Sequence, residues 1–354
     1  MNVLWLVPPS PYEGNPNVGQ YRFFKVMSTN SSIIYPYLNA SGVTMLRDAW
    51  FDVQYLDCPT LGLDKDNWKV HRKIQNADIV IMEARTPIMQ HIWNWTANIF
   101  GLNPDAKTIL YGDHVTAFPE ETLKKSFADF VVCSGDYDLA IVDLCKNIRS
   151  GTVASVMNYY PLTHDMDALP FVDRELVDWT QYYEAWRHRE TFFWTMSGRG
   201  CRYWCTFCAW VGTFWNHELR LRSVKNVADE FEMLYDTYGE CEILDDIDLF
   251  VTRWGNRFAT ELLSRGFKNK EILWAIQTHP NEIHNSEYLH NMANSGCKTV
   301  KLGIESLNDT TLKRINKSTT VKQIRKAFKI LKDNDIVEVD ATKRKGLAKI
   351  IRRG

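Results

Sequence analysis

The stretch Thr191–Trp210, TFFWTMSGRGCRYWCTFCAW, contains the residues that decide how this chain folds. It opens with an apolar run, Thr191–Met196, which is typical of a buried strand. The tetrapeptide SGRG follows as a turn. Cys201, Cys205 and Cys208 then come at C-x-x-x-C-x-x-C spacing. The pattern predicts a strand that delivers three thiols onto a single loop.

Three cysteines at this spacing suit three corners of a cubane iron–sulfur cluster, whose usual protein ligands are thiolates. The fourth iron then has no protein ligand, and an open metal position is what a substrate-binding centre needs. The alternative is a structural zinc site, which takes four ligands, often from two C-x-x-C pairs. The chain has no second pair, and the nearest candidate fourth ligand, His217, lies nine residues beyond Cys208. The spacing therefore favours the cluster.

The composition is ordinary for a soluble globular protein, with 45% hydrophobic and 24% charged residues. The 354 residues suggest two domains. A net charge of -1 gives no overall attraction to nucleic acid or to an anionic membrane. No apolar run reaches the roughly 20 residues needed to cross a bilayer, and the N-terminus does not resemble a signal peptide. We therefore expect a cytoplasmic protein with no membrane partner.

The other five cysteines are scattered among apolar neighbours. In a reducing compartment such cysteines are core residues more often than they are disulfide partners. We expect all five to be buried: Cys58, Cys133, Cys145, Cys241 and Cys297.

Short apolar runs alternate with helical periodicity through the first half of the chain. The predicted strands are Asn2–Val7, Val53–Leu56, Asp78–Met82, Thr108–Tyr111, Phe130–Cys133 and Val153–Met157. The predicted helices are Thr44–Ala49, Trp68–Gln75, Ile88–Phe100, Glu120–Ser126 and Tyr137–Lys146. This alternation predicts an α/β fold with a doubly wound parallel sheet of the flavodoxin or Rossmann kind, which binds ligands at the carboxyl ends of its strands.

Strand–helix units continue after the cysteines and predict a β/α barrel. The predicted strands are Cys241–Leu244, Leu273–Gln277, Thr299–Ile304 and Ile336–Val339. The predicted helices are Val224–Tyr238, Arg257–Arg265, Ser286–Ser295 and Val321–Lys332. Active groups of such folds lie at the carboxyl ends of the strands.

The residue types around the cysteines closely resemble the signature of radical S-adenosylmethionine (SAM) enzymes. The resemblance implies a [4Fe-4S] cluster whose open iron chelates the amino and carboxyl groups of SAM. One electron from the cluster then cleaves the sulfonium bond and gives a deoxyadenosyl radical. Phe207 occupies the aromatic position that in this family packs near the adenine. A small-molecule substrate and an electron donor such as flavodoxin or ferredoxin are further implied.

Other segments resemble the same family. Asp245 and Asp246 stand where a short motif binds the amino group of SAM. The segment LGIESLNDTTLKRINKSTT resembles the Gly-x-Glu-Ser segment, in which Glu305 and Ser306 would reach the ribose or carboxylate of SAM. Arg222 matches an Arg-Ser helix start. The alternatives are strand-end solvation or helix capping for the two aspartates, and a solvated side chain for the arginine.

Two histidines, His279 and His284, flank Pro280 in the segment QTHPNEIH. Histidine can shuttle protons near pH 7. The radical SAM family usually carries an arginine near the first of these positions. We therefore expect a surface or core role for both side chains.

The segment YGDHVTAFPEETLKKSFADFVVCSGDYD resembles the cobalamin-binding Rossmann-type domain that precedes many radical SAM enzymes. Gly112, His114 and Gly135 match its pattern, whereas Asp113 and Asp136 replace a Gly and a Glu. The resemblance implies cobalamin at this sheet edge. No Asp-x-His-x-x-G motif occurs in the sequence, so no protein histidine is expected as an axial ligand to cobalt.

The resemblance divides the chain into a cobalamin-binding-like domain (1–158), a linker (159–189), a partial radical SAM barrel (190–340) and a basic tail (341–354). The Gly-rich segment that the family carries after its fifth strand, and the sixth strand–helix unit, are not found before Gly354. We interpret the C-terminus as truncated or diverged. The leading hypothesis is a cobalamin-dependent radical SAM methyltransferase. The alternatives are a radical SAM enzyme whose vestigial first domain binds no cobalamin, and a non-catalytic metal-binding scaffold.

Overall fold

The structure is a computed structural model that describes residues 1–11, 32–267, 272–334, 336 and 338–341. The chain forms two compact units. The first comprises Met1–Thr163, Pro170–Trp186 and Thr213–Trp215, and the second comprises His164–Leu169, Arg187–Gly212 and Asn216–Gly354. The segment expected as a linker is thus divided between the two units. Positions 342–354 of the expected basic tail lie outside the described residues.

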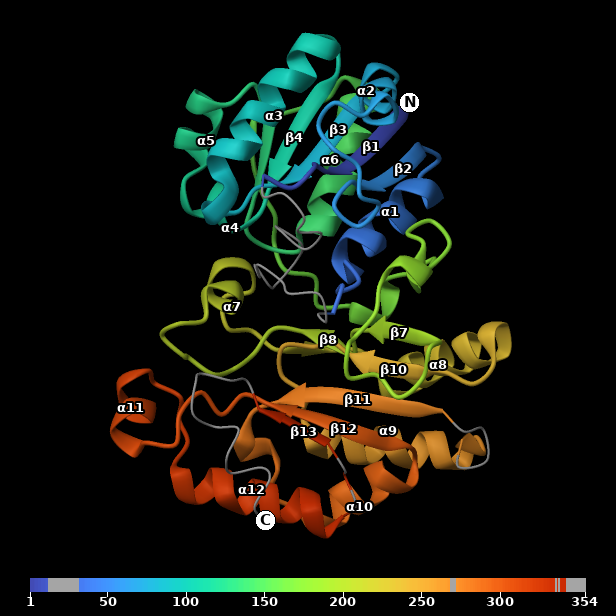
Figure 1. The fold of residues 1–354 in the computed structure, drawn as a ribbon, viewed down its shortest axis with the longest axis vertical. Helices are drawn as coiled ribbons and strands as arrows, with labels where there is room; N and C mark the ends of the chain where they lie inside the picture. Colours follow the sequence, from blue (N-terminus) through green and yellow to red (C-terminus); the bar gives the residue numbers. More distant parts are fainter. Residues whose placement is uncertain (12–31, 268–271, 335, 337, 342–354) are drawn as a thin grey trace. The chain divides into compact units, whose positions relative to one another are not determined.

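The first unit is built on a parallel six-stranded sheet with the strand order β2-β1-β3-β4-β5-β6 (Figure 1). The strands are β1 (Asn2–Val7), β2 (Asp52–Asp57), β3 (Ile79–Glu83), β4 (Lys107–Tyr111), β5 (Phe130–Cys133) and β6 (Met157–Tyr159). The chain adds β2 on one side of β1 and β3 on the other, so the direction of winding reverses at β1. This is the flavodoxin-like order, and it confirms the predicted doubly wound sheet.

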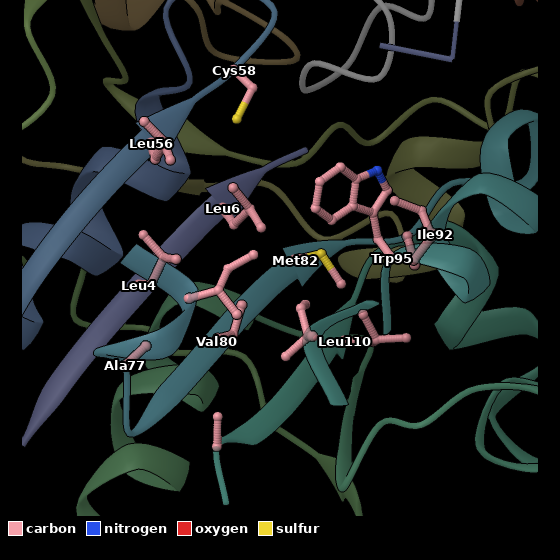
Figure 2. Close-up of a cluster of buried hydrophobic side chains, with 14 of the residues drawn as sticks. Leu4, Leu6, Leu56, Cys58, Ala77, Val80, Met82, Ile92, Trp95 and Leu110 are labelled. Atoms are coloured by element: carbon pink, nitrogen blue, oxygen red, sulfur yellow. The ribbon is translucent and has the colours of Figure 1, made fainter. Parts of the chain in front are cut away.

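Helices cover this sheet on both faces. They are α1 (Tyr37–Asp48), α2 (Trp68–Gln75), α3 (Met89–Leu102), α4 (Asp113–Ala117), α5 (Pro119–Lys125) and α6 (Tyr137–Ser150). Leu4 and Leu6 of β1 pack with Val80 of β3 and with Ile92 and Trp95 of α3 in one buried cluster (Figure 2). Successive strand residues point to opposite faces, which is why residues two apart meet the same helices.

The second unit contains a parallel sheet in which sequence order equals spatial order, β7-β10-β11-β12-β13. The strands are β7 (Phe192–Thr195), β10 (Glu242–Asp245), β11 (Leu273–Thr278), β12 (Cys297–Leu302) and β13 (Glu338–Ala341). Because parallel crossovers are right-handed, a sheet that always adds strands on the same side places its helices on one face. This is the arrangement of a partial barrel.

The helices of the second unit follow that rule. They are α8 (Val224–Tyr238), α9 (Thr252–Ser264), α10 (Ser286–Asn294), α11 (Asp309–Arg314) and α12 (Val321–Asp333). Helix α9 packs between α8 and α10, and α10 also contacts α12. Figure 1 shows α9, α10 and α12 along one side of the sheet. A short antiparallel pair, β8 (Gly198–Arg199) and β9 (Arg220–Leu221), flanks the loop that precedes helix α7 (Ala209–Phe214).

Two predicted elements of the first unit have the wrong bounds. Helix α1 begins seven residues before Thr44, although Ser41 and Gly42 are weak helix formers. A Cβ on Gly42 would lie 2.5 Å from the Trp5 ring, so packing requires the glycine inside the helix. Strand β6 begins at Met157 rather than at Val153, because the Ser155 hydroxyl bonds the backbone of Met157 and makes a local turn.

The five scattered cysteines are all fully buried, as predicted. Burial raises the pKa of Cys145 to about 12 and that of Cys133 to about 11. Such thiols are packing residues at neutral pH. Within the part of the chain that the structure describes, no helix is both long enough and apolar enough to cross a membrane.

Candidate cluster and cofactor site

The cysteine loop, residues 201–208, follows strands β7 and β8 at the carboxyl edge of the second sheet. At its start, the Gly200 amide donates a hydrogen bond to Asp248 Oδ2 at 2.9 Å. The Cys208 amide donates to the Cys205 carbonyl at 3.1 Å, which closes a tight turn between the second and third cysteines. The strand-to-loop transition therefore places all three cysteines beyond the end of the sheet.

The three thiols are half-buried, unlike the five core cysteines. Burial raises the pKa of Cys201 to about 12, and the neighbouring thiols of Cys205 and Cys208 add to the effect. Burial also raises the pKa of Cys205, although Lys317 opposes that shift. The three sulfurs are thus close enough to influence one another electrostatically. Iron favours the deprotonated form of a coordinating thiol, so a cation here would relieve this mutual repulsion.

The donor set fits an iron–sulfur cluster, because it consists of three mutually interacting thiols on one half-exposed loop. Among the described residues, no three His, Cys, Asp or Glu side chains already surround a common point at ligating distance. A cubane cluster does not need such a point, because each cysteine ligates a different iron. The cysteine loop therefore supplies the three thiolate ligands.

A second loop, residues 315–319, lies against the cysteine loop. The Thr206 amide donates to the Ile315 carbonyl at 3.0 Å, and Asn316 Nδ2 donates to the Trp204 carbonyl at 2.8 Å. Lys317 is 6% exposed, and its Nζ lies 5.6 Å from the centre of the Phe207 ring and 3.4 Å from Glu305 Oε1. These contacts bring Phe207 and Glu305, two predicted cofactor-binding residues, to a single lysine next to the cysteines.

Asp245 and Asp246, at the end of β10, are both buried. Asp245 Oδ1 accepts hydrogen bonds from the Ser197 amide at 3.0 Å and from the Ile247 amide at 3.3 Å. Burial nevertheless raises the pKa of Asp245 to about 6. Asp246 Oδ1 accepts from Gln277 Nε2 at 2.9 Å. The Asp245 carboxylate therefore braces the turn that leads from β7 to the cysteine loop.

Arg222 is buried in contact with a carboxylate. Its Nη1 donates to Glu230 Oε2 at 2.5 Å and to the Met196 carbonyl at 3.1 Å. Glu230 also accepts from Thr195 Oγ1 at 2.7 Å. The guanidinium thus ties α8 to the end of β7. The next residue, Ser223, caps α8 by accepting from the Asn226 amide, so the predicted Arg-Ser helix start is present.

The remaining residue of the strand-end segment, Ser306, accepts a hydrogen bond from the Asn308 amide at 3.2 Å, and its own amide donates to the Ile304 carbonyl at 2.6 Å. Its neighbour Glu305 has a left-handed backbone, with φ at 56°. Such a conformation is unusual outside glycine, and it occurs at positions that the surrounding structure determines. The segment after β12 is therefore a tight turn that presents Glu305 toward Lys317.

In the first unit, Gly112 and Gly135 follow β4 and β5 with φ values of 126° and 68°. A Cβ on Gly112 would lie 2.5 Å from the Ala84 carbonyl oxygen, and one on Gly135 would lie 2.1 Å from the Tyr160 carbonyl oxygen. Close backbone packing therefore accounts for both glycines. Gly112 precedes the short helix α4.

His114 lies in α4 at the carboxyl edge of the first sheet. Its Nδ1 is 3.1 Å from Thr86 Oγ1, and its ring packs against Trp93 and Phe118. Burial lowers its pKa, so the ring is neutral near pH 7. Nε2 is buried and has no hydrogen-bond partner among the described residues. An orphaned buried nitrogen fits a site that accepts one further polar group.

Residues 195–342 match the Radical SAM superfamily. The matched segment is a radical SAM domain. The match begins at the end of β7 and takes in the cysteine loop, so the three cysteines and the strand ends after them lie within the radical SAM domain.

Related proteins extend the likeness into the first unit. The anaerobic magnesium-protoporphyrin IX monomethyl ester cyclase of Rubrivivax gelatinosus is 26% identical over 323 residues, 85% of this chain and 56% of the relative. An uncharacterized methyltransferase of Pyrococcus horikoshii is 26% identical over 72% of this chain and 57% of its own length. The chain thus spans about half the length of the curated relatives it matches.

Solved structures resemble both units. The radical SAM methyltransferase TsrM from Kitasatospora setae, with tryptophan and a SAM analogue bound, aligns with a TM-score of 0.69 at 15% identity, over 96% of this chain and 67% of its own. The cobalamin-dependent radical SAM enzyme OxsB aligns with a TM-score of 0.69 at 14% identity, over 96% of this chain and 48% of its own. At these identities the likeness establishes the fold.

Within the radical SAM domain, the predicted site residues fall into two groups. Phe207 and Glu305 meet beside the cysteine loop. Asp245 and Arg222 instead hold the strand ends in place through backbone and ion-pair contacts. Lys317 was not among the predicted site residues. The signal that points to it is the sequence INKS, in which two left-handed residues, Asn316 and Ser318, fix one lysine at the turn.

Proposed function

We propose that this protein binds a [4Fe-4S] cluster through Cys201, Cys205 and Cys208 and uses it to cleave SAM reductively. The observation that carries the proposal is the position of three interacting, half-exposed thiols beyond the end of β7 in a radical SAM domain. When bound, the cluster supplies one electron to the sulfonium of SAM. The protein residues bind and orient SAM and shield the site from water.

The roles of the surrounding residues follow from their contacts. Phe207, which is 47% exposed, offers a ring face to the adenine. Glu305 and Ser306 accept hydrogen bonds from SAM at the end of β12, and Asp246 attracts the amino group beyond the end of β10. Asp245 acts as a positioning residue through its bonds to the Ser197 and Ile247 amides. Arg222 acts as a positioning residue, because its guanidinium is bonded to Glu230 and to backbone.

We further propose that the first unit binds cobalamin at its carboxyl edge, near Gly112, His114 and Gly135, and that the reaction is a methyl transfer to a small molecule. The sheet order and the orphaned His114 Nε2 support a cofactor there. Relatives named as methyltransferases and the cobalamin-bound neighbours support the reaction class. A flavodoxin- or ferredoxin-type donor in the cytoplasm would supply the electrons.

Elemental analysis of anaerobically reconstituted protein tests both parts. We expect about four irons and four sulfides per chain with a broad visible absorbance, as for a Cys-ligated cubane, and one cobalt after incubation with cobalamin. Incubation with SAM and a strong reductant should then release deoxyadenosine or a methylated acceptor. Tightly bound zinc without visible absorbance would contradict the cluster assignment.

A radical SAM enzyme with a vestigial first unit is the second candidate. The observation that favours it is that backbone packing alone accounts for Gly112 and Gly135. Under this alternative the protein binds iron and sulfide and cleaves SAM, but it retains no cobalt at micromolar cobalamin. The cobalt measurement therefore separates the two candidates without knowledge of the substrate.

A further inference from the structure

The cysteine loop is held by side chains that no cluster ligand or SAM contact accounts for. The Tyr203 ring, between the first two cysteines, stacks on the His279 ring with a centroid separation of 3.8 Å and an interplanar angle of 16°. Trp204 stacks on His217 at 3.8 Å, and His217 Nδ1 lies 2.7 Å from the Tyr203 carbonyl oxygen. Two aromatic contacts thus grip the stretch between Cys201 and Cys205.

His279 is fixed on both of its ring nitrogens. Nδ1 accepts a hydrogen bond from the Asn281 amide at 3.2 Å, so the proton is on Nε2, which donates to the Lys317 carbonyl at 2.7 Å. The ring is only 4% exposed. Because both nitrogens bond to backbone, the proton-shuttle interpretation of this histidine is disfavoured. The His279 ring packs between the end of β11, the loop that carries Lys317 and the cysteine loop.

Polar contacts from the same turn also hold the cysteine loop. Tyr203 Oη donates to Glu282 Oε1 at 3.0 Å, and the same carboxylate oxygen forms an ion pair with Arg202. Asn281 Nδ2 donates to the Ser318 carbonyl at 2.6 Å. The turn that carries His279 and Glu282 therefore contacts both the cysteine loop and the loop that carries Lys317. The turn at residues 279–282 therefore helps to position both of these loops.

We propose that His279 is a positioning residue that holds the cysteine loop ready to accept its cluster, by stacking on Tyr203 and bonding to the Lys317 carbonyl. The inference rests on the proposed function of the three cysteines. Its physical basis is that metal sites depend on partners which orient the ligands before the metal arrives. The stack orients the backbone of the loop that carries the three cysteines.

The first measurement uses the full-length, metal-free protein. Hydrogen–deuterium exchange is followed on peptides that span residues 201–208. We expect His279→Ala to speed exchange there by about tenfold, since a stack and a buried hydrogen bond are lost together. His284→Ala is the matched control, because His284 lies on the same turn, is exposed and, within the described residues, bonds to the Asn281 carbonyl. The control should leave this exchange unchanged.

Two further variants separate the ring from the hydrogen bond. His279→Phe keeps an aromatic ring and loses the donor, whereas His279→Gln keeps a donor and loses the ring. Because the ring is the part that touches the cysteine loop, His279→Phe should restore slow exchange more fully than His279→Gln. The opposite order would overturn the stack as the positioning contact. Both variants also guard against a general folding defect in the alanine variant.

The second measurement is cluster assembly with iron and sulfide, followed by absorbance. Loss of partners that orient metal ligands costs about 10- to 100-fold in metal affinity, so His279→Ala should bind iron at least tenfold more weakly, and His279→Phe less so. Unchanged exchange at 201–208, or faster exchange with unchanged iron affinity, would overturn the proposal. If the unsubstituted protein takes up no iron, the proposed function fails, while the exchange experiment still decides whether His279 holds the loop.

Discussion

Each of the two parallel sheets has a carboxyl edge, and the two edges differ in chemistry. In the first unit, charged and polar groups at the described strand ends bond to one another. Glu83 and Arg85 form a buried ion pair, and the Tyr111 hydroxyl accepts from Trp5 Nε1 and donates to Asn39. In the second unit, the corresponding edge carries three half-exposed thiols and a half-exposed phenylalanine, Phe207.

The difference shows that the carboxyl end of a parallel strand does not by itself make a ligand-binding site. Parallel sheets bring side chains together at this edge whether or not they meet a ligand. What distinguishes the second edge is accessibility: Cys201, Cys205 and Cys208 are half-buried and lie beside the buried Lys317, whereas Cys133 at the end of β5 is fully buried. At the first edge, His114 Nε2 is a buried nitrogen that has no hydrogen-bond partner within the described residues. Substitutions at the second edge should therefore change iron binding more than folding stability. Substitutions at the first edge should mainly lower folding stability.

The largest effect is expected at the cysteine loop. Cys205→Ala should abolish the visible absorbance of the reconstituted protein, because two thiolates cannot hold the cluster that three hold. Thermal unfolding of the metal-free protein should change little, since Cys205 is only half-buried. The measurement is iron content with absorbance after anaerobic reconstitution.

Cys145→Ala is the control for this substitution. Cys145 is fully buried in α6 of the first unit, and its thiol has a pKa near 12. The variant should keep its full iron content and lose about 1 kcal/mol of stability through lost packing. Equal loss of iron in both variants would mean that the cysteine loop holds no cluster of its own.

The next effect concerns the buried ion pair at the edge of the first unit. Arg85→Met should destabilise the fold by about 3–5 kcal/mol, because it removes the arginine that pairs with the buried Glu83 carboxylate. The double variant Glu83→Gln/Arg85→Met should recover much of that loss. Lys65→Met, which breaks the exposed pair with Asp66, should cost less than about 1 kcal/mol. Urea unfolding measures all three, and a small loss in Arg85→Met would show that Glu83 does not depend on this partner.

A pair of glycines tests whether backbone packing shapes the same edge. Gly135 and Gly62 have nearly equal φ values, 68° and 64°, but a Cβ on Gly62 meets nothing within 4 Å. Gly62→Ala should therefore cost only the left-handed backbone strain, about 1–2 kcal/mol. Gly135→Ala should cost about 2 kcal/mol more, because its Cβ would overlap the Tyr160 carbonyl. Equal losses in chemical denaturation would contradict the close approach.

Local sequence signals predicted much of the fold. Helix α8 has its predicted bounds, Val224–Tyr238, because Ser223 caps its start and Gly239 follows its end. Strands β1 (Asn2–Val7) and β5 (Phe130–Cys133) also have their predicted bounds, and the cysteine loop follows β7 as the spacing predicted. Packing partners distant in sequence were not predictable in this way. The bond between Asn316 and Trp204 joins residues 112 positions apart, and no local pattern encodes it.

The same limit applies within the candidate site. Sequence resemblance treated Asp245, Arg222 and Phe207 alike, as cofactor-binding residues. Their surroundings separate them, because Asp245 bonds to two backbone amides and Arg222 pairs with Glu230, whereas the Phe207 ring is half-exposed. Burial and partners depend on the assembled structure, so a motif can identify the strand end but cannot assign the task of each side chain.

The smallest effect is a pH dependence at Asp245. Its pKa in the folded state, about 6, lies above the ordinary aspartate value of 3.8, because burial favours the neutral carboxyl. The carboxyl's favourable contribution is complete below pH 3.8 and is lost as the pH rises through 6. Asp245→Asn keeps an oxygen to accept from the Ser197 and Ile247 amides and removes the buried charge. The variant should therefore match the parent near pH 4 and be more stable by about 1–3 kcal/mol at pH 8.

Asp229→Asn is the control of opposite sign. Lys225 and Arg265 lower the pKa of Asp229, so loss of this carboxylate should destabilise the protein at neutral pH. Unfolding by urea at several pH values between 4 and 8 measures both, and a pH-independent gain in Asp245→Asn would show that the strand end of the second unit carries no desolvated charge.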